Sequence, residues 1–141
     1  MSLLIDQLAA WLQVQGEGTV GTTIFKTYRP SSPVACISLH ATGGYPPPAY
    51  TDREFPTVQL VARAATPDGA LRKAYSLYNR LHRQGNLDLG GDLTALSILA
   101  SQSPGNVGSE EAQASQSAGA ASQTAHLASF NIVVQLRQAS S

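Results

Sequence analysis

Charged residues are scarce in this 141-residue sequence, where Asp, Glu, Lys and Arg together make up 13% of the chain. Soluble domains commonly carry about 25%. Nine basic and nine acidic residues give a formal net charge of zero, so the chain has no general attraction for nucleic acid or for an anionic membrane surface. A neutral surface with few charges promotes association. The composition therefore favours a protein that contacts other proteins.

Cysteine is limited to Cys36, so no disulfide can form within the chain, and nothing indicates a protein built for an oxidising compartment. No run approaches the roughly 20 apolar residues of a membrane span. The first segment, MSLLIDQLAAWLQVQG, has no basic start and no long apolar stretch, so it does not resemble a signal peptide. We expect a soluble protein made in the cytoplasm, with a single domain over residues 1–141.

Groups that could carry out catalysis are scattered along the chain. His40, His82 and His126 fall in three different predicted elements, and no pair of them has metal-ligand spacing. Cys36 lies inside an apolar run and is most simply a small core residue. A nucleophile needs a nearby base, and the sequence offers none. We therefore expect no enzyme activity, no metal and no cofactor.

Apolar spacing predicts two helices and five strands. One helix ends before Gly16, a typical C-terminal cap. The other begins after Thr66, a good N-terminal cap, and ends at Gly85. Strands are predicted over 22–30, 34–41, 56–64 and 93–101, and over a last segment in which Phe130, Ile132, Val134 and Leu136 alternate with other residues. Residues 86–92, NLDLGGD, are predicted to form a turn.

The order of these elements predicts a two-layer α+β domain, with one mixed, mostly antiparallel sheet of about five strands and two helices on one face. The first three strands are expected to pair antiparallel, and the second helix is expected to cross over between the third and fourth strands. From Ser101 to about Thr124 the chain consists mainly of Ser, Gln, Ala and Gly. This composition predicts a flexible, low-complexity loop.

The second helix has a basic face formed by Arg72, Lys73, Arg80 and Arg83. The simplest interpretation is a solvated helix face, since positive charge is favourable near a helix C-terminus. A contact between subunits and a surface close to DNA are the alternatives. The face carries no interleaved aromatic residues of the kind that stack on bases.

The segment GGYPPPAY, residues 43–50, joins two predicted strands. Proline-rich ligands usually lie in disordered tails next to a basic residue, whereas this segment is fixed at both ends. We interpret it as a stiff loop between strands.

Four stretches follow one another in an order that resembles the minor capsid or tail terminator (tail completion) family of long-tailed bacteriophages. They are IFKTYRPSSPVACISLHATGGYPPPAY, FPTVQLVARAATPDGALRKAYSLYNRLHR, PGNVGSEE and SFNIVVQLR. The resemblance covers nearly the whole chain. Its most specific part is the proline-rich loop, the strand that ends in Arg63 and the helix with KAYSLYNRL. In the family the closing strand follows PGNVGSEE closely, whereas here AQASQSAGAASQTAHLA intervenes, so no residue role is transferred to that stretch.

The resemblance implies a structural virion protein at the junction of tail and head, made in the host bacterial cytoplasm. Such a protein forms a six-fold ring on the tail tube, stops tube polymerisation and provides the surface that joins the head. The implied partners are further copies of the chain, the tail tube protein and head–tail connector proteins, with no membrane and with DNA only passing through the channel. The expected assembly contacts are Tyr45, Pro46, Pro47, Pro48, Tyr50, Arg53, Glu110 and Glu111. A head-side neck (head completion) protein and a small monomeric peptide-binding module are the alternatives.

Overall fold

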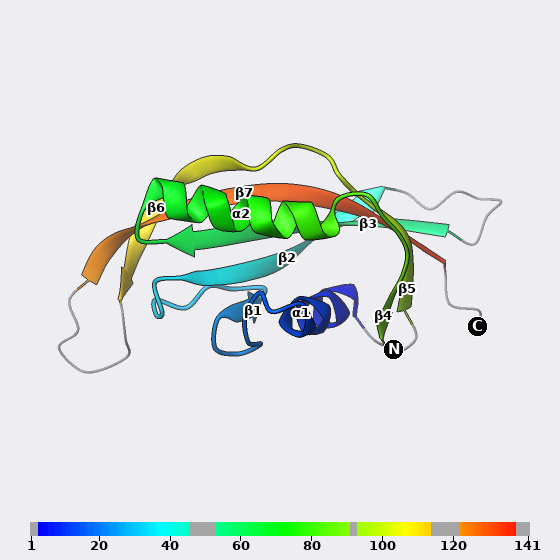
Figure 1. The fold of residues 1–141 in the computed structure, drawn as a ribbon, viewed down its shortest axis with the longest axis horizontal. Coiled ribbons are helices and arrows are strands. Elements are labelled where there is room, and N and C mark those ends of the chain that lie inside the picture. The colour runs from blue at the N-terminus through cyan, green and yellow to red at the C-terminus, as the bar shows by residue number, and fades with distance from the viewer. Residues whose placement is uncertain (1–2, 46–52, 91–92, 114–121, 138–141) are drawn as a thin grey trace.

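The computed structural model describes residues 3–45, 53–90, 93–113 and 122–137, which form two helices and seven strands (Figure 1). The helices are α1 (Leu4–Val14) and α2 (Pro67–Leu81). The strands are β1 (Ile24–Lys26), β2 (Cys36–Tyr45), β3 (Arg53–Ala64), β4 (Gln84–Gly90), β5 (Leu93–Ala100), β6 (Gly105–Gln113) and β7 (Ser122–Arg137).

Helix α1 forms because its apolar residues recur on one side. Leu8, Ala9 and Leu12 are buried, and Asp6 lies in the first turn, where a negative charge suits the helix dipole. The Asp6 carboxylate also accepts a hydrogen bond from Lys26 Nζ of β1 at 2.7 Å. Gly16 follows the helix with φ +85°, a left-handed conformation that glycine adopts without strain. The predicted end of this helix is confirmed.

Helix α2 starts as predicted. Thr66 Oγ1 accepts a hydrogen bond from the Gly69 backbone N–H at 3.0 Å, and Pro67 occupies the first turn. The helix ends at Leu81, earlier than expected, because His82 already has extended backbone angles. Four α2 residues face the core: Ala70, Ala74, Leu77 and Leu81.

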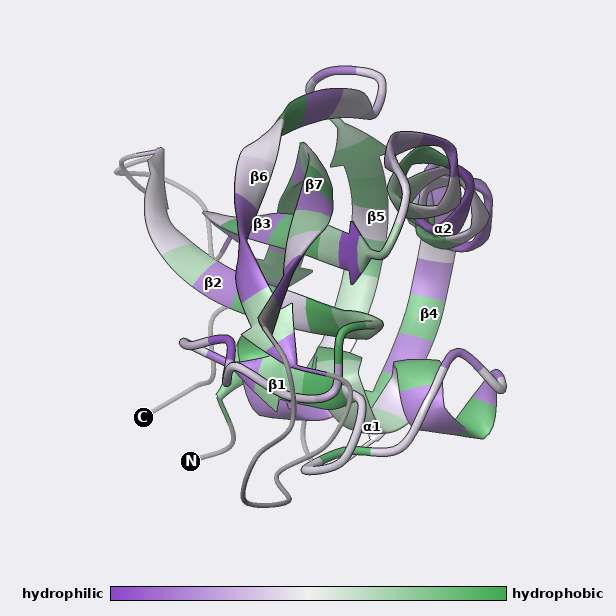
Figure 2. Ribbon diagram, turned by 90° about the vertical axis from the view of Figure 1, so that its left-hand side faces the viewer, coloured by the Kyte–Doolittle hydropathy of each residue, from purple (hydrophilic) through white to green (hydrophobic). Residues whose placement is uncertain are grey.

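The seven strands form one sheet in the order β1-β2-β3-β7-β5-β4, with β6 also paired to β7. Strand β7 is the centre of this arrangement. It pairs with β3 along one edge and with β5 and β6 along the other, always antiparallel. Because β3 and β5 both run antiparallel to β7, they are parallel to one another, which fits the expected crossover through α2. Figure 2 shows that the sheet curls into a half-barrel with both helices on the same side.

The prediction of about five strands is wrong. Strand β4 occupies most of the predicted turn at 86–92, where Leu87 and Asp88 pair with β5. Strand β6 and the first residues of β7 lie in the stretch predicted as a loop from 101 to 124. Gly, Ser, Asn and Asp are poor strand formers, so neither segment carries a local pattern that predicts a strand. Pairing with a neighbouring strand decides the conformation of both segments.

The first strand also departs from the prediction. It is only three residues long and runs parallel to β2, with Ile24 opposite Ile37, whereas an antiparallel pair was expected. Residues 27–35 form a connection long enough to return the chain to the start of β2. Thr27, directly after the strand, has φ +78°, a left-handed conformation that takes the chain out of the strand. Pro30 and Pro33 further along cannot donate backbone hydrogen bonds, so the strand does not resume there.

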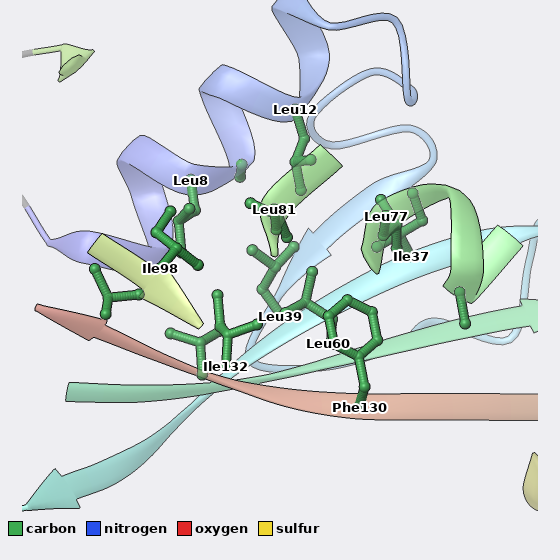
Figure 3. Close-up of a cluster of buried hydrophobic side chains, with 14 of the residues drawn as sticks. Leu8, Leu12, Ile37, Leu39, Leu60, Leu77, Leu81, Ile98, Phe130 and Ile132 are labelled. Atoms are coloured by element: carbon green, nitrogen blue, oxygen red, sulfur yellow. The ribbon is translucent and has the colours of Figure 1, made fainter. Parts of the chain in front are cut away.

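A single large core lies between the helices and one face of the sheet (Figure 3). It contains residues of both helices and of the central strands, including Leu8, Leu77, Leu60 and Phe130, all fully buried. The Phe130 ring packs edge-on against Tyr78 of α2, with ring centroids 5.8 Å apart. The expected α+β architecture with both helices on one face is therefore confirmed.

Candidate assembly surface

The face of the sheet opposite the helices carries Arg63, whose side chain is almost completely buried. Leu60 and Ala62 of β3 point into the main core, so Arg63 points the other way by strand alternation. Only 2% of Arg63 is exposed. Burying an arginine side chain costs free energy unless its N–H groups donate hydrogen bonds. In this protein Nε, Nη1 and Nη2 of Arg63 all donate.

Arg63 binds the connection between β1 and β2 through three backbone carbonyls. Its Nε donates to Val34 O at 2.9 Å, and its Nη2 donates to Pro30 O and Pro33 O at 2.6 Å each. Its Nη1 donates to Glu110 Oε1 of β6 at 2.7 Å. One side chain of β3 therefore joins two segments that are far apart in the sequence.

Glu110 is also bound by a second arginine. Arg29 Nε donates to Glu110 Oε1 at 3.1 Å and Arg29 Nη2 to Oε2 at 3.3 Å. Burial acts to raise the pKa of Glu110, but the hydrogen bonds and charges of Arg29 and Arg63 outweigh it and hold that pKa below its ordinary value. Glu110 is therefore an anion in the folded protein at neutral pH. We call Arg29, Arg63 and Glu110 the clamp.

The clamp fixes the end of the β6–β7 hairpin. His126 is the last β7 residue that pairs with β3, so residues 110–113 of β6 and 122–125 of β7 extend past β3 as a two-stranded arm. Figure 1 shows this arm running away from the N-terminal end of α2. Ala112 and Ala125 of the arm form a small apolar cluster with Val34. The Gln113 N–H also donates to Ser31 O at 2.6 Å.

The basic face of α2 is partly neutralised inside the subunit by Glu17, whose side chain is only 3% exposed. Its carboxylate accepts hydrogen bonds from Lys73 Nζ at 2.7 Å, from Ser76 Oγ at 2.9 Å and from Arg80 Nε. Burial acts to raise the pKa of Glu17, but these three donors lower it below its ordinary value. Lys73 and Arg80 thus anchor the segment between α1 and β1, whereas Arg72 and Arg83 are exposed.

The remaining expected contacts lie elsewhere. Tyr45 ends β2 and is 60% exposed, and Arg53 begins β3 opposite Arg137 of β7. Pro46, Pro47, Pro48 and Tyr50 lie outside the described residues. Glu110 and Glu111 are neighbours on β6, but Glu110 belongs to the clamp and Glu111 is exposed.

The open part of the sheet face beside Tyr45 is hollow and uncharged. A hollow of about 330 Å³ is lined by hydroxyl, amide and apolar side chains: Thr42, Tyr45, Thr57, Gln59, Ser101, Asn131 and Val133. This part of the surface accounts for some of the scarcity of charge in the sequence.

The histidines and the cysteine have local structural surroundings. His82 Nδ1 accepts a hydrogen bond from the Ala100 N–H at 2.9 Å, and its ring stacks on Tyr78. Burial lowers the pKa of His40, and the charge of Arg29 adds to this effect. Cys36 is buried, as predicted for a core residue, and burial raises the pKa of its thiol. Among the described residues, no group of three or more His, Cys, Asp or Glu side chains could hold a metal ion.

The sequence did not reveal Arg29, Arg63 or Glu17 as important residues. Arg63 ends a predicted strand, but strand alternation does not say whether the face on which a residue lies is covered by other segments. Glu17 follows the predicted end of a helix, where an acidic residue is ordinarily solvated. No sequence signal would have identified the partners of these side chains.

No helix in the described part of the chain has the length and apolar character needed to cross a membrane. Comparison with curated proteins finds no match. A family model described as "Bacteriophage tail terminator protein" matches residues 11–135, which is most of the chain. The match includes the end of α1, all of α2 and all the described strands except the last two residues of β7. The chain therefore belongs to the bacteriophage tail terminator family, whose members are structural proteins of the virion.

Proposed function

We propose that this protein forms a six-fold ring at the end of the phage tail tube, where it ends tube polymerisation and provides the surface that joins the head. The observation that carries the proposal is the family match over residues 11–135. The role requires no chemical step, so the protein acts as a structural component and not as an enzyme. Its partners are further copies of itself, the tail tube protein and the head–tail connector.

The surface of the subunit supports this role. A closed ring of like subunits needs two different contact patches on each copy. The β6–β7 arm and the outward side of α2 are two such patches, and the uncharged hollow beside Tyr45 provides a third surface. Surfaces with few charges lose little favourable hydration when they are buried in a contact.

The direct test is a polymerisation assay with purified tail tube subunits. We expect tubes grown with this protein to stop at shorter lengths than tubes grown alone, with a ring of six copies on one end in electron micrographs. Tubes of the same length with and without the protein, and no protein bound at tube ends, would contradict the proposal. Binding to the portal side alone would instead indicate a head-side neck protein.

A further inference from the structure

The basic side chains in the described part of the chain differ in whether they form ion pairs within the subunit. Five of them form ion pairs with acidic side chains of the same subunit: Lys26, Arg29, Arg63, Lys73 and Arg80. Arg72 and Arg83 are exposed, and no ion pair of theirs is found within the described part of the chain. Both belong to the outward side of α2 or to its C-terminal end.

An exposed aromatic residue lies between these arginines in the sequence. Tyr75 is 40% exposed, and a hollow of about 550 Å³ runs beside it along α2, lined also by Leu71 and Arg72 and, in the first turn of the helix, by the acidic Asp68. We call Arg72, Tyr75 and Arg83 the helix stripe. It combines positive charge with an aromatic side chain, a combination that is common in protein interfaces.

The arm carries the opposite charge. Glu110 points toward Arg63, and Ala112 points into the small apolar cluster on the same side of β6. Glu111 lies between them in the strand and therefore points to the other side. Glu111 is exposed, and its Oε1 accepts only a weak hydrogen bond from Thr124 Oγ1 at 3.3 Å. Val107, at the base of the same strand, is an exposed apolar residue. The arm therefore offers an acidic and an apolar group, which complement the helix stripe.

The clamp gives the arm a defined position before any contact forms. The arm extends past the end of β3, and there its two strands pair only with each other, so no further strand of the sheet holds the arm in place. The hydrogen bonds of Glu110 to Arg29 and Arg63 hold it against residues 29–34. A contact element that is already ordered loses less entropy on binding.

We propose that the arm of one copy docks on the helix stripe of a second copy, with Glu111 as the contact residue and Glu110, Arg29 and Arg63 as positioning residues. The inference rests on the proposed ring. Because the two patches differ, the contact is heterologous and repeats from copy to copy until the ring closes.

Charge reversal with reciprocal rescue tests the contact. We expect Glu111→Lys alone, and Arg72→Glu with Arg83→Glu alone, each to reduce ring formation on tube ends about tenfold or more, since like charges then face each other. An equal mixture of the two variants restores rings, because they can alternate in a six-membered ring with opposite charges at every contact. Asp88→Lys, the same reversal at an exposed acid of β4, leaves ring formation unchanged. Normal rings from either variant alone, or no restoration by the mixture of folded variants, would overturn the contact.

The positioning residues need a separate readout. We expect Glu110→Gln to accelerate hydrogen–deuterium exchange over residues 105–113 about tenfold or more, because local opening becomes easier, while exchange over 58–62 stays the same. Glu111→Gln, the matched change at the adjacent residue, leaves exchange in the arm unchanged. Equal exchange in the wild type and in Glu110→Gln would overturn the role of the clamp.

The ring assay separates failure of the proposed function from failure of the proposed contact. If the wild-type protein forms no ring on tube ends, the proposed function fails. If the wild type forms rings and the charge-reversed variants form them equally well, only the contact between the arm and the helix stripe fails.

Discussion

Glu17 and Glu110 each bind two cationic side chains, but they join different parts of the fold. Glu17 attaches the segment after α1 to α2, and Glu110 attaches the arm to β3 and to the β1–β2 connection. Removing one partner of a buried charge pair leaves the other without compensation, which costs more than the pair itself contributes. At the scale of single residues, these carboxylates decide how the connecting segments are held.

Replacing Glu17 tests this at the first site. We expect Glu17→Gln to lower the free energy of unfolding by about 2 kcal/mol, the range found for hydrogen bonds to charged groups. Lys73 and Arg80 are partly exposed, so solvent compensates for some of the lost charge. Urea denaturation measures the change. Glu111→Gln, at an exposed acid, changes this free energy by less than about 0.5 kcal/mol; equal effects of the two variants would contradict the prediction.

Acid should weaken the fold through the same two groups. The pKa values of Glu17 and Glu110 lie below 4.5 in the folded protein, so below this pH the unfolded state binds more protons than the folded state. Their contribution to stability is complete above about pH 4.5 and is lost as the pH falls through the lowered values. We expect the unfolding free energy to fall steeply from pH 5 to pH 3, measured by urea denaturation.

The double variant Glu17→Gln, Glu110→Gln provides the control for this pH dependence. It lacks both titrating groups, so its unfolding free energy should change less over the same pH interval than that of the wild type. Parallel curves for the two proteins would show that other carboxylates cause the acid sensitivity.

At the scale of elements, strand β7 connects the fold. Its 16 residues pair with three other strands, and its inward residues form the middle of the core. Helix α2 packs against this strand and β3, and Tyr78 contacts Phe130 directly. Much of the helix–sheet packing therefore depends on side chains of β7.

Truncating Phe130 should accordingly be severe. We expect Phe130→Ala to lower the free energy of unfolding by about 4 kcal/mol, from lost apolar burial and from the cavity that remains. The measurement is the denaturant midpoint at neutral pH. Leu99→Ala, on the neighbouring strand β5, removes a side chain that is 51% exposed and should cost less than about 1 kcal/mol. A loss of stability for Phe130→Ala no larger than that for Leu99→Ala would contradict the central role of β7.

At the scale of the whole molecule, the proposed contact surfaces lie on different sides of the core. The arm, the helix stripe and the uncharged hollow belong to different elements, which suits a subunit that must contact several neighbours at once. The proline-rich segment at 46–48 is a further expected contact, outside the described residues, and its role stays a prediction.

Replacing Pro46, Pro47 and Pro48 with glycine tests that segment. Proline limits the freedom of the unbound loop and so reduces the entropy lost when a contact orders it. We expect the free energy of unfolding to fall by no more than about 1 kcal/mol per residue, while the protein concentration needed to stop tube growth rises about tenfold. Comparable losses of folding and of tube capping would show that the segment serves only the fold.

The sequence by itself determined the elements whose signals are local. Thr66 and Pro67 mark the start of α2 because capping depends on neighbouring residues alone. The alternation from Phe130 to Leu136 marks β7 because one face of that strand is buried along its length. Two helices, the long strands and their α+β arrangement follow from such patterns.

Only the tertiary structure decided the rest. Strands β4 and β6 exist because partners supply their hydrogen bonds, and a strand without a buried apolar face has no local signature. The partners of Arg63 lie at positions 30, 33, 34 and 110, and those of Glu17 lie on α2. Such contacts form between residues that are distant in sequence, so their energies depend on how the chain folds back on itself and leave no periodic pattern along it.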